Sequence, residues 1–257
     1  MKKITLFAIT LAIIGLASCG NAVKNANGSD STVIENRDTL QTADLSMFFL
    51  QGPVKTVSYQ RREDGGAWEE TDKLEFDKEG RLTGFQCWTA SGDGYLKILY
   101  AKDPDGEILV EKQKRKIERD ESGRITMLPT EYTDGKNNSN FGLYWTYNIK
   151  GRPSVKETVV MGYYMTEEFT SWNEKLGLPI VMKYEMSGRG MEEETTHTYT
   201  YKKFDQWGNF TEREISTHGK FEDRMLLAGD DGEEHYADDS YEIRTNSIEH
   251  RIITYYE

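Results

Sequence analysis

The sequence predicts an all-β fold, an antiparallel β-hairpin meander whose continuous sheet is curved or rolled. Two observations carry this prediction. From about residue 45 to the end, runs rich in Tyr, Thr, Val and Ile alternate with Gly beside Asp or Asn, a composition typical of strands joined by tight turns. No window of comparable length keeps an apolar stripe with helical period. A β-sandwich is the alternative, because about a dozen strands can divide into two packed sheets.

A repeated turn signature organises this region. It consists of Asp or Asn, two variable residues and Gly, often followed by Arg or Asn; one copy has an extra residue. Asp or Asn can cap a tight turn with its side chain and Gly supplies a positive φ, so each copy predicts a hairpin turn. The expected structural pairs are Asp77 with Gly80, Asp103 with Gly106, Asp120 with Gly123, Asn148 with Gly151, Asn173 with Gly177, and Asp205 with Gly208.

Local patterns add detail between these turns. Residues 195–204 alternate, with His197, Tyr199 and Tyr201 on one face and threonines on the other, which predicts a half-buried strand. We expect Cys87 to be a small buried hydrophobe rather than a reactive thiol. Further turns are expected at 64–66, 92–94 and 134–135, and short helices at 44–50 and 222–228.

At its repeated turns the chain resembles the YD-repeat, or RHS-like, proteins, whose repeat has a Tyr-Asp-x-x-Gly-Arg core. It is most similar to small Bacteroidales lipoproteins that carry a few such repeats. Residues 50–57 resemble the opening strand of those proteins, 204–213 their late repeat and 252–256 their closing strand. The resemblance implies a single YD-repeat-like β domain over 45–257 and no particular activity. The chain has far fewer repeats than the large toxin-enclosing shells, so we expect no encapsulating role.

The N-terminus has the features of an export signal. Two lysines precede an apolar run at 4–16, and small residues lead into Cys19. The segment 16–20 resembles the lipobox of bacterial lipoproteins, which implies a signal peptide over 1–18 and acyl chains on Cys19. An uncleaved anchor helix and a plain secretory signal are the alternatives. Residues 19–44 are mostly small and polar, so we expect a flexible lipidated tether.

The residue after Cys19 predicts where the lipoprotein is retained. Gly20 differs from the Asp that marks inner-membrane retention in lipoprotein sorting, so we expect an outer-membrane protein. No acidic patch follows Cys19, and a periplasm-facing domain is therefore favoured over a domain at the cell surface. The membrane is then the first expected partner, bound through the N-terminal lipid.

Composition and motifs restrict the possible functions. A formal net charge of −12 argues against nucleic acid as a partner. The four histidines have no metal-ligand spacing, and no nucleophile or phosphate-loop signature is present, so we expect no catalytic residue, metal or cofactor. The acidic stretch 230–239 could hold calcium, but it does not match the EF-hand pattern, and a solvated loop is favoured.

These observations favour a non-catalytic binding or structural module of the cell envelope, with a protein or a glycan as its partner. The alternative is a carboxylate-dependent envelope hydrolase. The two hypotheses differ in where their acidic side chains should lie. A hydrolase needs several acids in one concave pocket with perturbed proton affinity, whereas a binding module can keep them dispersed over turns.

Overall fold

The computed structural model describes residues 41–88, 95–98, 108–110, 113–133, 138–160, 162–188, 190–228 and 234–257. All of them belong to one compact unit, Asp38–Glu257. Its elements are α1 (Ala43–Met47), β1 (Val54–Glu63), β2 (Glu69–Phe76), β3 (Leu82–Trp88), β4 (Tyr95–Ile98), β5 (Ile108–Val110), β6 (Gln113–Arg115), β7 (Glu118–Arg119), β8 (Ile125–Thr133), β9 (Asn138–Tyr147), β10 (Pro153–Val160), β11 (Tyr163–Asn173), β12 (Leu178–Gly188), β13 (Met191–Phe204), β14 (Phe210–Ala228) and β15 (Glu234–Tyr255).

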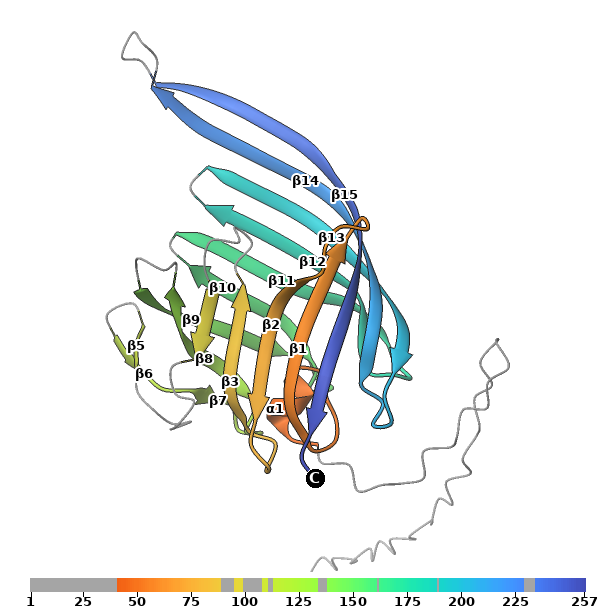
Figure 1. Ribbon diagram of the computed structural model, residues 1–257. Coiled ribbons are helices and arrows are strands. Elements are labelled where there is room, and N and C mark those ends of the chain that lie inside the picture. Colours follow the sequence, from red (N-terminus) through yellow and green to blue (C-terminus); the bar gives the residue numbers. More distant parts are fainter. Residues whose placement is uncertain are drawn as a thin grey trace, which may run out of the picture. The chain divides into compact units, whose positions relative to one another are not determined.

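The strands form one antiparallel sheet, with β5 and β6 as a separate ribbon (Figure 1). The order is β4-β3-β2-β1-β15-β14-β13-β12-β11-β10-β9-β8-β7, so nearly every strand lies beside its neighbour in sequence. β4 pairs with β3 and also with β8, over four residue pairs, which requires the sheet to be rolled. The predicted all-β meander with a rolled sheet is confirmed, and the strands do not divide into two packed layers.

The first and last strands of the domain lie side by side. β1 pairs with β15, and Val57 lies opposite Ile253 while Tyr59 lies opposite Arg251. This contact joins chain segments almost 200 residues apart. It makes β1 the link between the hairpins of β2–β4 and the long meander that ends in β15.

Four of the five described repeat turns share one hydrogen-bond pattern, whereas in the turn with an extra residue the Asn173 side chain accepts from the Lys175 and Leu176 N–H groups. In the turn between β7 and β8, the Asp120 carboxylate accepts hydrogen bonds from the backbone N–H groups of Ser122 and Arg124, at 2.9 and 3.0 Å. The Gly123 N–H donates to the Asp120 carbonyl at 2.9 Å. The glycines that close these turns, Gly80, Gly123, Gly151, Gly177 and Gly208, have φ between +69° and +85°. Asp103 and Gly106 lie outside the described residues.

Successive connections of an antiparallel meander lie at alternate ends of the sheet. The described repeat turns follow β2, β7, β9, β11 and β13, so they lie at the same end. We call this the repeat-turn end. The turn at 64–65, between β1 and β2, lies at the opposite end, and the turns expected at 92–94 and 134–135 fall outside the described residues.

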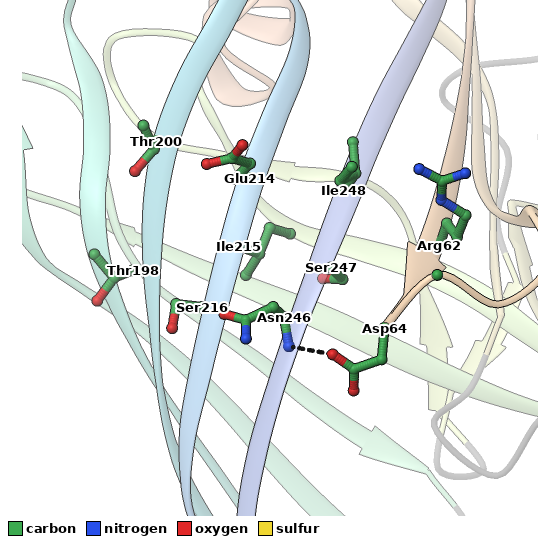
Figure 2. Close-up of a pocket in the computed structure, with 11 residues that line it drawn as sticks. Arg62, Asp64, Thr198, Thr200, Glu214, Ile215, Ser216, Asn246, Ser247 and Ile248 are labelled. Atoms are coloured by element: carbon green, nitrogen blue, oxygen red, sulfur yellow. Dashed lines mark hydrogen bonds between the residues drawn. The ribbon is translucent and has the colours of Figure 1, made fainter.

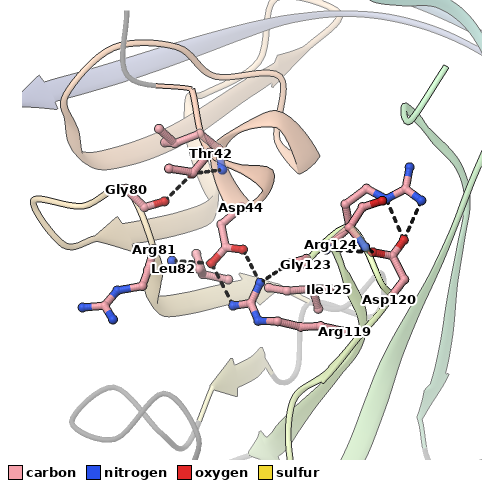
Figure 3. Close-up of polar contacts among 12 residues, drawn as sticks. Thr42, Asp44, Gly80, Arg81, Leu82, Arg119, Asp120, Gly123, Arg124 and Ile125 are labelled. Carbon is pink, nitrogen blue, oxygen red and sulfur yellow. Dashed lines mark hydrogen bonds and ion pairs between the residues drawn. The ribbon is translucent and has the colours of Figure 1, made fainter.

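Helix α1 fills the inside of the rolled sheet at the repeat-turn end. Thr42 caps the helix by accepting from the Leu45 N–H, and its hydroxyl donates to the Gly80 carbonyl at 2.6 Å. Asp44 is 3 % exposed; its carboxylate accepts from the Leu82 N–H and forms an ion pair with Arg119 at 2.6 Å (Figure 3). The helix therefore connects two repeat turns through one buried carboxylate.

An apolar core surrounds this helix. Leu45, Leu50, Val54, Leu74 and Phe76 are each at most 2 % exposed and belong to one cluster with the first residues of β1 and β3 and with residues of β8 and β9. Burying one such side chain contributes about 1.5–3 kcal/mol, so the main apolar stabilisation of the domain lies at the repeat-turn end.

Two local predictions need correction, and one is confirmed. Residues 222–228 are not helical; they belong to β14, because they continue its pairing with β15 as far as Ala228. The helix expected at 44–50 is shorter, Ala43–Met47. Strands β14 and β15 have 19 and 22 residues. Residues 195–204 form a strand within β13 as predicted. Cys87 lies in β3, but its side chain is outside the described set. Within the described residues, no helix is long and apolar enough to cross a membrane.

The substitution Gly208→Ala isolates the backbone requirement of a repeat turn. A Cβ at Gly208 would meet no atom within 4 Å, and φ is +85°, so the cost comes from the left-handed conformation alone. We expect the free energy of unfolding to fall by about 1–2 kcal/mol in urea titrations of the full chain. Gly208→Asn is the control, and its free energy of unfolding should fall less, because Asn tolerates the left-handed region. Equal losses in the two variants would contradict the turn mechanism.

Candidate functional site

The inner face of the rolled sheet encloses a cavity of about 770 Å³. Side chains alternate between the two faces of a strand, so every second residue of β1, β2, β13, β14 and β15 points into this interior cavity. Cross-strand register places these inward residues in layers. Polar, charged and aromatic side chains line the cavity, and at its inner end the wall includes Met47, Leu74 and Phe85 of the apolar core around α1.

Strand β1 illustrates the layers. Val57 is fully buried in the apolar core, and Tyr59, two residues on, is 7 % exposed. Arg61 follows and donates from Nε to the Ser247 hydroxyl at 3.0 Å. Glu63, at the end of the strand, is exposed. The interior thus changes from apolar to charged to solvent-exposed with distance from the repeat-turn end.

The charged layer contains two arginines and one glutamate from neighbouring strands. Arg213 of β14 and Glu249 of β15 lie opposite each other and form an ion pair at 2.9 Å, with side chains 13 % and 9 % exposed. Arg251, 6 % exposed, stacks on Phe210, with the guanidinium carbon 3.4 Å from the ring centroid. Arg213 also stacks on Tyr199, at 4.1 Å.

This layer is incompletely hydrogen-bonded. Nε of Arg213, Oε1 of Glu249, and both Nε and Nη1 of Arg251 are buried and have no hydrogen-bond partner among the described residues. Loss of hydration lowers the pKa of Arg251, whereas the facing Glu249 carboxylate raises the pKa of Arg213 against the effect of burial. Buried charged groups without partners are costly, and a bound ligand, an ion or ordered water completes the bonding of such groups.

Further acids converge on the same cavity. Glu167 pairs with Lys156 at 2.6 Å across β10 and β11. Asp72, opposite Tyr59, has a pKa raised to about 7 by loss of hydration, with a smaller opposing effect of Lys156. Burial also raises the pKa of Glu193. The cavity therefore combines acids of perturbed proton affinity with fixed cations.

His197 is the histidine of the cavity. Its Nε2 and Nδ1 lie 3.1 and 3.0 Å from the hydroxyls of Thr195 and Thr217. Burial and, secondly, the charge of Arg61 lower its pKa to about 4. The ring is neutral near pH 7, so it offers one hydrogen-bond donor and one acceptor rather than a charge.

A second recess, of about 430 Å³, lies on the outer face and crosses β13, β14, β15 and the end of β1 (Figure 2). We call it the outer groove. Thr198 and Thr200 line it from β13 and Ser216 from β14, while Asp64 accepts a hydrogen bond from the Asn246 N–H at 3.2 Å. Most of its side chains are polar, and Ile215 and Ile248 also line it. The buried, incompletely bonded charges lie in the interior cavity, so we take that cavity as the candidate site.

The structure separates the turn residues from the candidate site. Asp77, Asp120 and Asp205 bind the backbone of their own turns, and Asn148 and Asn173 do the same through their amide oxygens. None of these turn residues lines the interior cavity. Cys19 lies outside the described residues, and so do residues 230–233 and the side chains of 234–238 in the acidic stretch at 230–239.

Sequence analysis missed the residues that do converge, above all Arg213, Glu249 and Arg251. The sequence holds one weak signal for them. These charged residues lie an even number of positions from buried or partly buried apolar residues of the same strand, so they point to the same face. Within the described residues, no three His, Cys, Asp or Glu side chains are grouped closely enough to hold a metal ion. Comparisons of the chain with family models, with curated proteins and with solved structures find no match.

The raised pKa of Asp72 predicts a pH dependence of stability. The folded protein keeps this proton up to about pH 7, whereas an unfolded chain loses it near 3.8, so the contribution of Asp72 to stability falls as the pH rises through that window. Asp72→Asn does not titrate. We expect the free energy of unfolding of this variant, relative to the unmodified chain, to increase between pH 5 and pH 8 in denaturant titrations. Glu214→Gln, on the outer face, is the control, and an equal change in both variants would contradict the assignment.

Proposed function

We propose that the protein is a lipid-anchored protein of a bacterial envelope, whose rolled sheet binds a ligand in the interior cavity without transforming it. The observation that supports this proposal is the Arg213–Glu249–Arg251 layer, which is buried and incompletely hydrogen-bonded. A buried ion pair contributes little to stability, and apolar residues of similar size often serve as well or better. A role in binding accounts for such a layer better than a role in folding.

The dimensions of the cavity favour a small molecule or the end of a glycan or peptide chain. Ligand pockets typically enclose about 300–1,000 Å³ and combine apolar walls with a few placed polar groups. Trp145 and Tyr184 supply ring surfaces here, beside His197 and the ion pairs. A folded protein domain binds over a broad surface instead, and would not enter a recess of this size.

Placement in the envelope rests on the N-terminal sequence. Acyl chains on Cys19 would hold the protein at the outer membrane, and each buried methylene contributes about 0.8 kcal/mol to membrane association. The tether expected over 19–44 must end before Thr42, which caps α1, and a flexible segment over 19–41 would have an r.m.s. reach of about 25–30 Å. The binding domain could then sample the periplasm near the membrane without embedding in it.

A carboxylate-dependent envelope hydrolase is the second candidate. The observation that favours it is the raised pKa of Asp72, which suits a general acid near neutral pH, in a cavity that also holds Glu167 and Glu249. Turnover of an envelope polysaccharide or peptide that Asp72→Asn abolishes, while ligand binding and folding persist, would establish the hydrolase and overturn the binding module.

Two tryptophan substitutions distinguish the interior cavity from the outer groove. Thr245→Trp places a large ring in the cavity, whereas Thr200→Trp places the same ring in the outer groove. The full chain is tested on an array of envelope glycans and peptides. We expect Thr245→Trp to weaken the binding of captured ligands at least tenfold and Thr200→Trp to leave it unchanged. The opposite result would move the binding site to the outer groove.

Lipid anchoring is tested by Cys19→Ser. We expect metabolic labelling with palmitate to mark the unmodified chain and not the variant, and cleavage before residue 19 to require the cysteine. The unmodified chain should fractionate with the outer membrane, and its domain should resist protease added to intact cells. Release of the domain by that protease would place it at the cell surface instead.

A further inference from the structure

We propose that the interior cavity holds its ligand by a carboxylate group, which Arg251 and Arg213 bind. This inference rests on the proposed binding function and specifies the chemistry of the ligand. It starts from an imbalance of charge in the buried layer. Among the described residues, the two guanidinium groups have one carboxylate within ion-pair distance, Glu249, and it is already paired with Arg213.

Arg251 is the group that lacks an anion. Among the described residues it forms no ion pair, and its one hydrogen bond runs from Nη2 to the Phe48 carbonyl at 3.3 Å. Nε and Nη1 have no partner, although the side chain is only 6 % exposed. A buried cation without a counter-ion attracts any anion that can reach it.

The surroundings of Arg251 determine how such an anion can approach. The guanidinium lies against Phe210 and Tyr59, 3.4 and 4.8 Å from their ring centroids. Because these rings stack on the guanidinium, its edge is the part left for hydrogen bonding. Arg213, which also lies over Phe210, has its own unpartnered Nε. A carboxylate has two oxygens and can accept from both arginines.

The outer part of the cavity argues against polyanions. Glu63, Glu69 and Glu70 line the cavity and are exposed, and Glu63 is paired with Arg61 at 3.1 Å. A ligand with several phosphates or sulfates would be repelled there. The charge distribution fits a ligand with one anionic group at its inner end and a neutral or cationic remainder. A peptide C-terminus and a terminal uronic acid both satisfy this requirement.

Matched ligand pairs test the proposal on the unmodified full chain. One pair is a tetrapeptide with a free C-terminal carboxylate and the same peptide as its amide. The other is an oligosaccharide ending in a single glucuronate and the same oligosaccharide with that acid reduced to glucose. We expect isothermal titration calorimetry to give at least tenfold tighter binding for the carboxylate member of one pair. That pair shows whether the natural ligand is a peptide or a glycan. Equal affinity within both pairs would overturn the carboxylate assignment and leave the binding function standing, whereas absence of binding by all four would overturn both.

Variants locate the bound carboxylate. Arg251→Met keeps the bulk of the side chain and removes its charge, and should abolish the preference for the carboxylate over its neutral partner. Arg244→Gln is the control, because Arg244 lies on the same strand and points to the exposed outer face, where it pairs with Glu242. Retained preference in a folded Arg251→Met protein would exclude Arg251 as the anion site. Should that variant fail to fold, the ligand pairs on the unmodified chain still decide the question.

Discussion

The pairing of β1 with β15 is the contact on which the rest of the structure depends. A meander of consecutive hairpins needs only local pairing, and without this contact β2–β4 would not be joined to the later strands through β1. The pairing places Tyr59 opposite Arg251 and brings Asp72, on the other side of Tyr59, to the same layer. The charged layer of the cavity depends on this non-local contact, and together with the pairing of β4 with β8 it gives the sheet its rolled shape.

The local part of the fold was predictable from the sequence for a physical reason. A turn is specified by a few adjacent residues: Asp120 caps it, Gly123 supplies the positive φ, and no distant segment is needed. Strand character was predictable in the same way, from alternation in 195–204. Residues 222–228 were mistaken for a helix because pairing with β15 overrides a local preference, and that pairing is non-local.

The candidate site was not predictable, because each of its parts is ordinary when taken alone. Charged residues on strands of an acidic protein suggest an outer face in water, and Arg213, Glu249 and Arg251 give no local sign that they face inward. Their burial depends on which parity of β14 and β15 faces the interior, and the register with β1 decides that. The acids that the sequence does single out are those of the turn motif, and they accept hydrogen bonds from the backbone of their own turns.

The repeat turns also interact with one another, which explains why a basic residue follows several of the glycines. Arg124 stacks on Tyr147, which leads into the next repeat turn, with its guanidinium carbon 4.5 Å from the ring centroid. Arg152 stacks on Trp172 and pairs with Glu174 of the turn that follows. At the far side, the Asn209 amide forms two hydrogen bonds with the backbone of Gln51, just after α1. The turns are therefore connected laterally.

This arrangement separates stability from binding along the strands. The repeat-turn end holds α1, the apolar core and the lateral contacts between turns, and its buried Asp44 carboxylate is bonded to Leu82 and Arg119. In the cavity, by contrast, Arg251 is buried and forms no ion pair with any described residue. The strands are long enough to pass through both regions. The apolar stabilisation at the repeat-turn end can therefore offset the free-energy cost of unsatisfied charge in the cavity. A sheet of short hairpins could not, because its strands would end within the apolar layer.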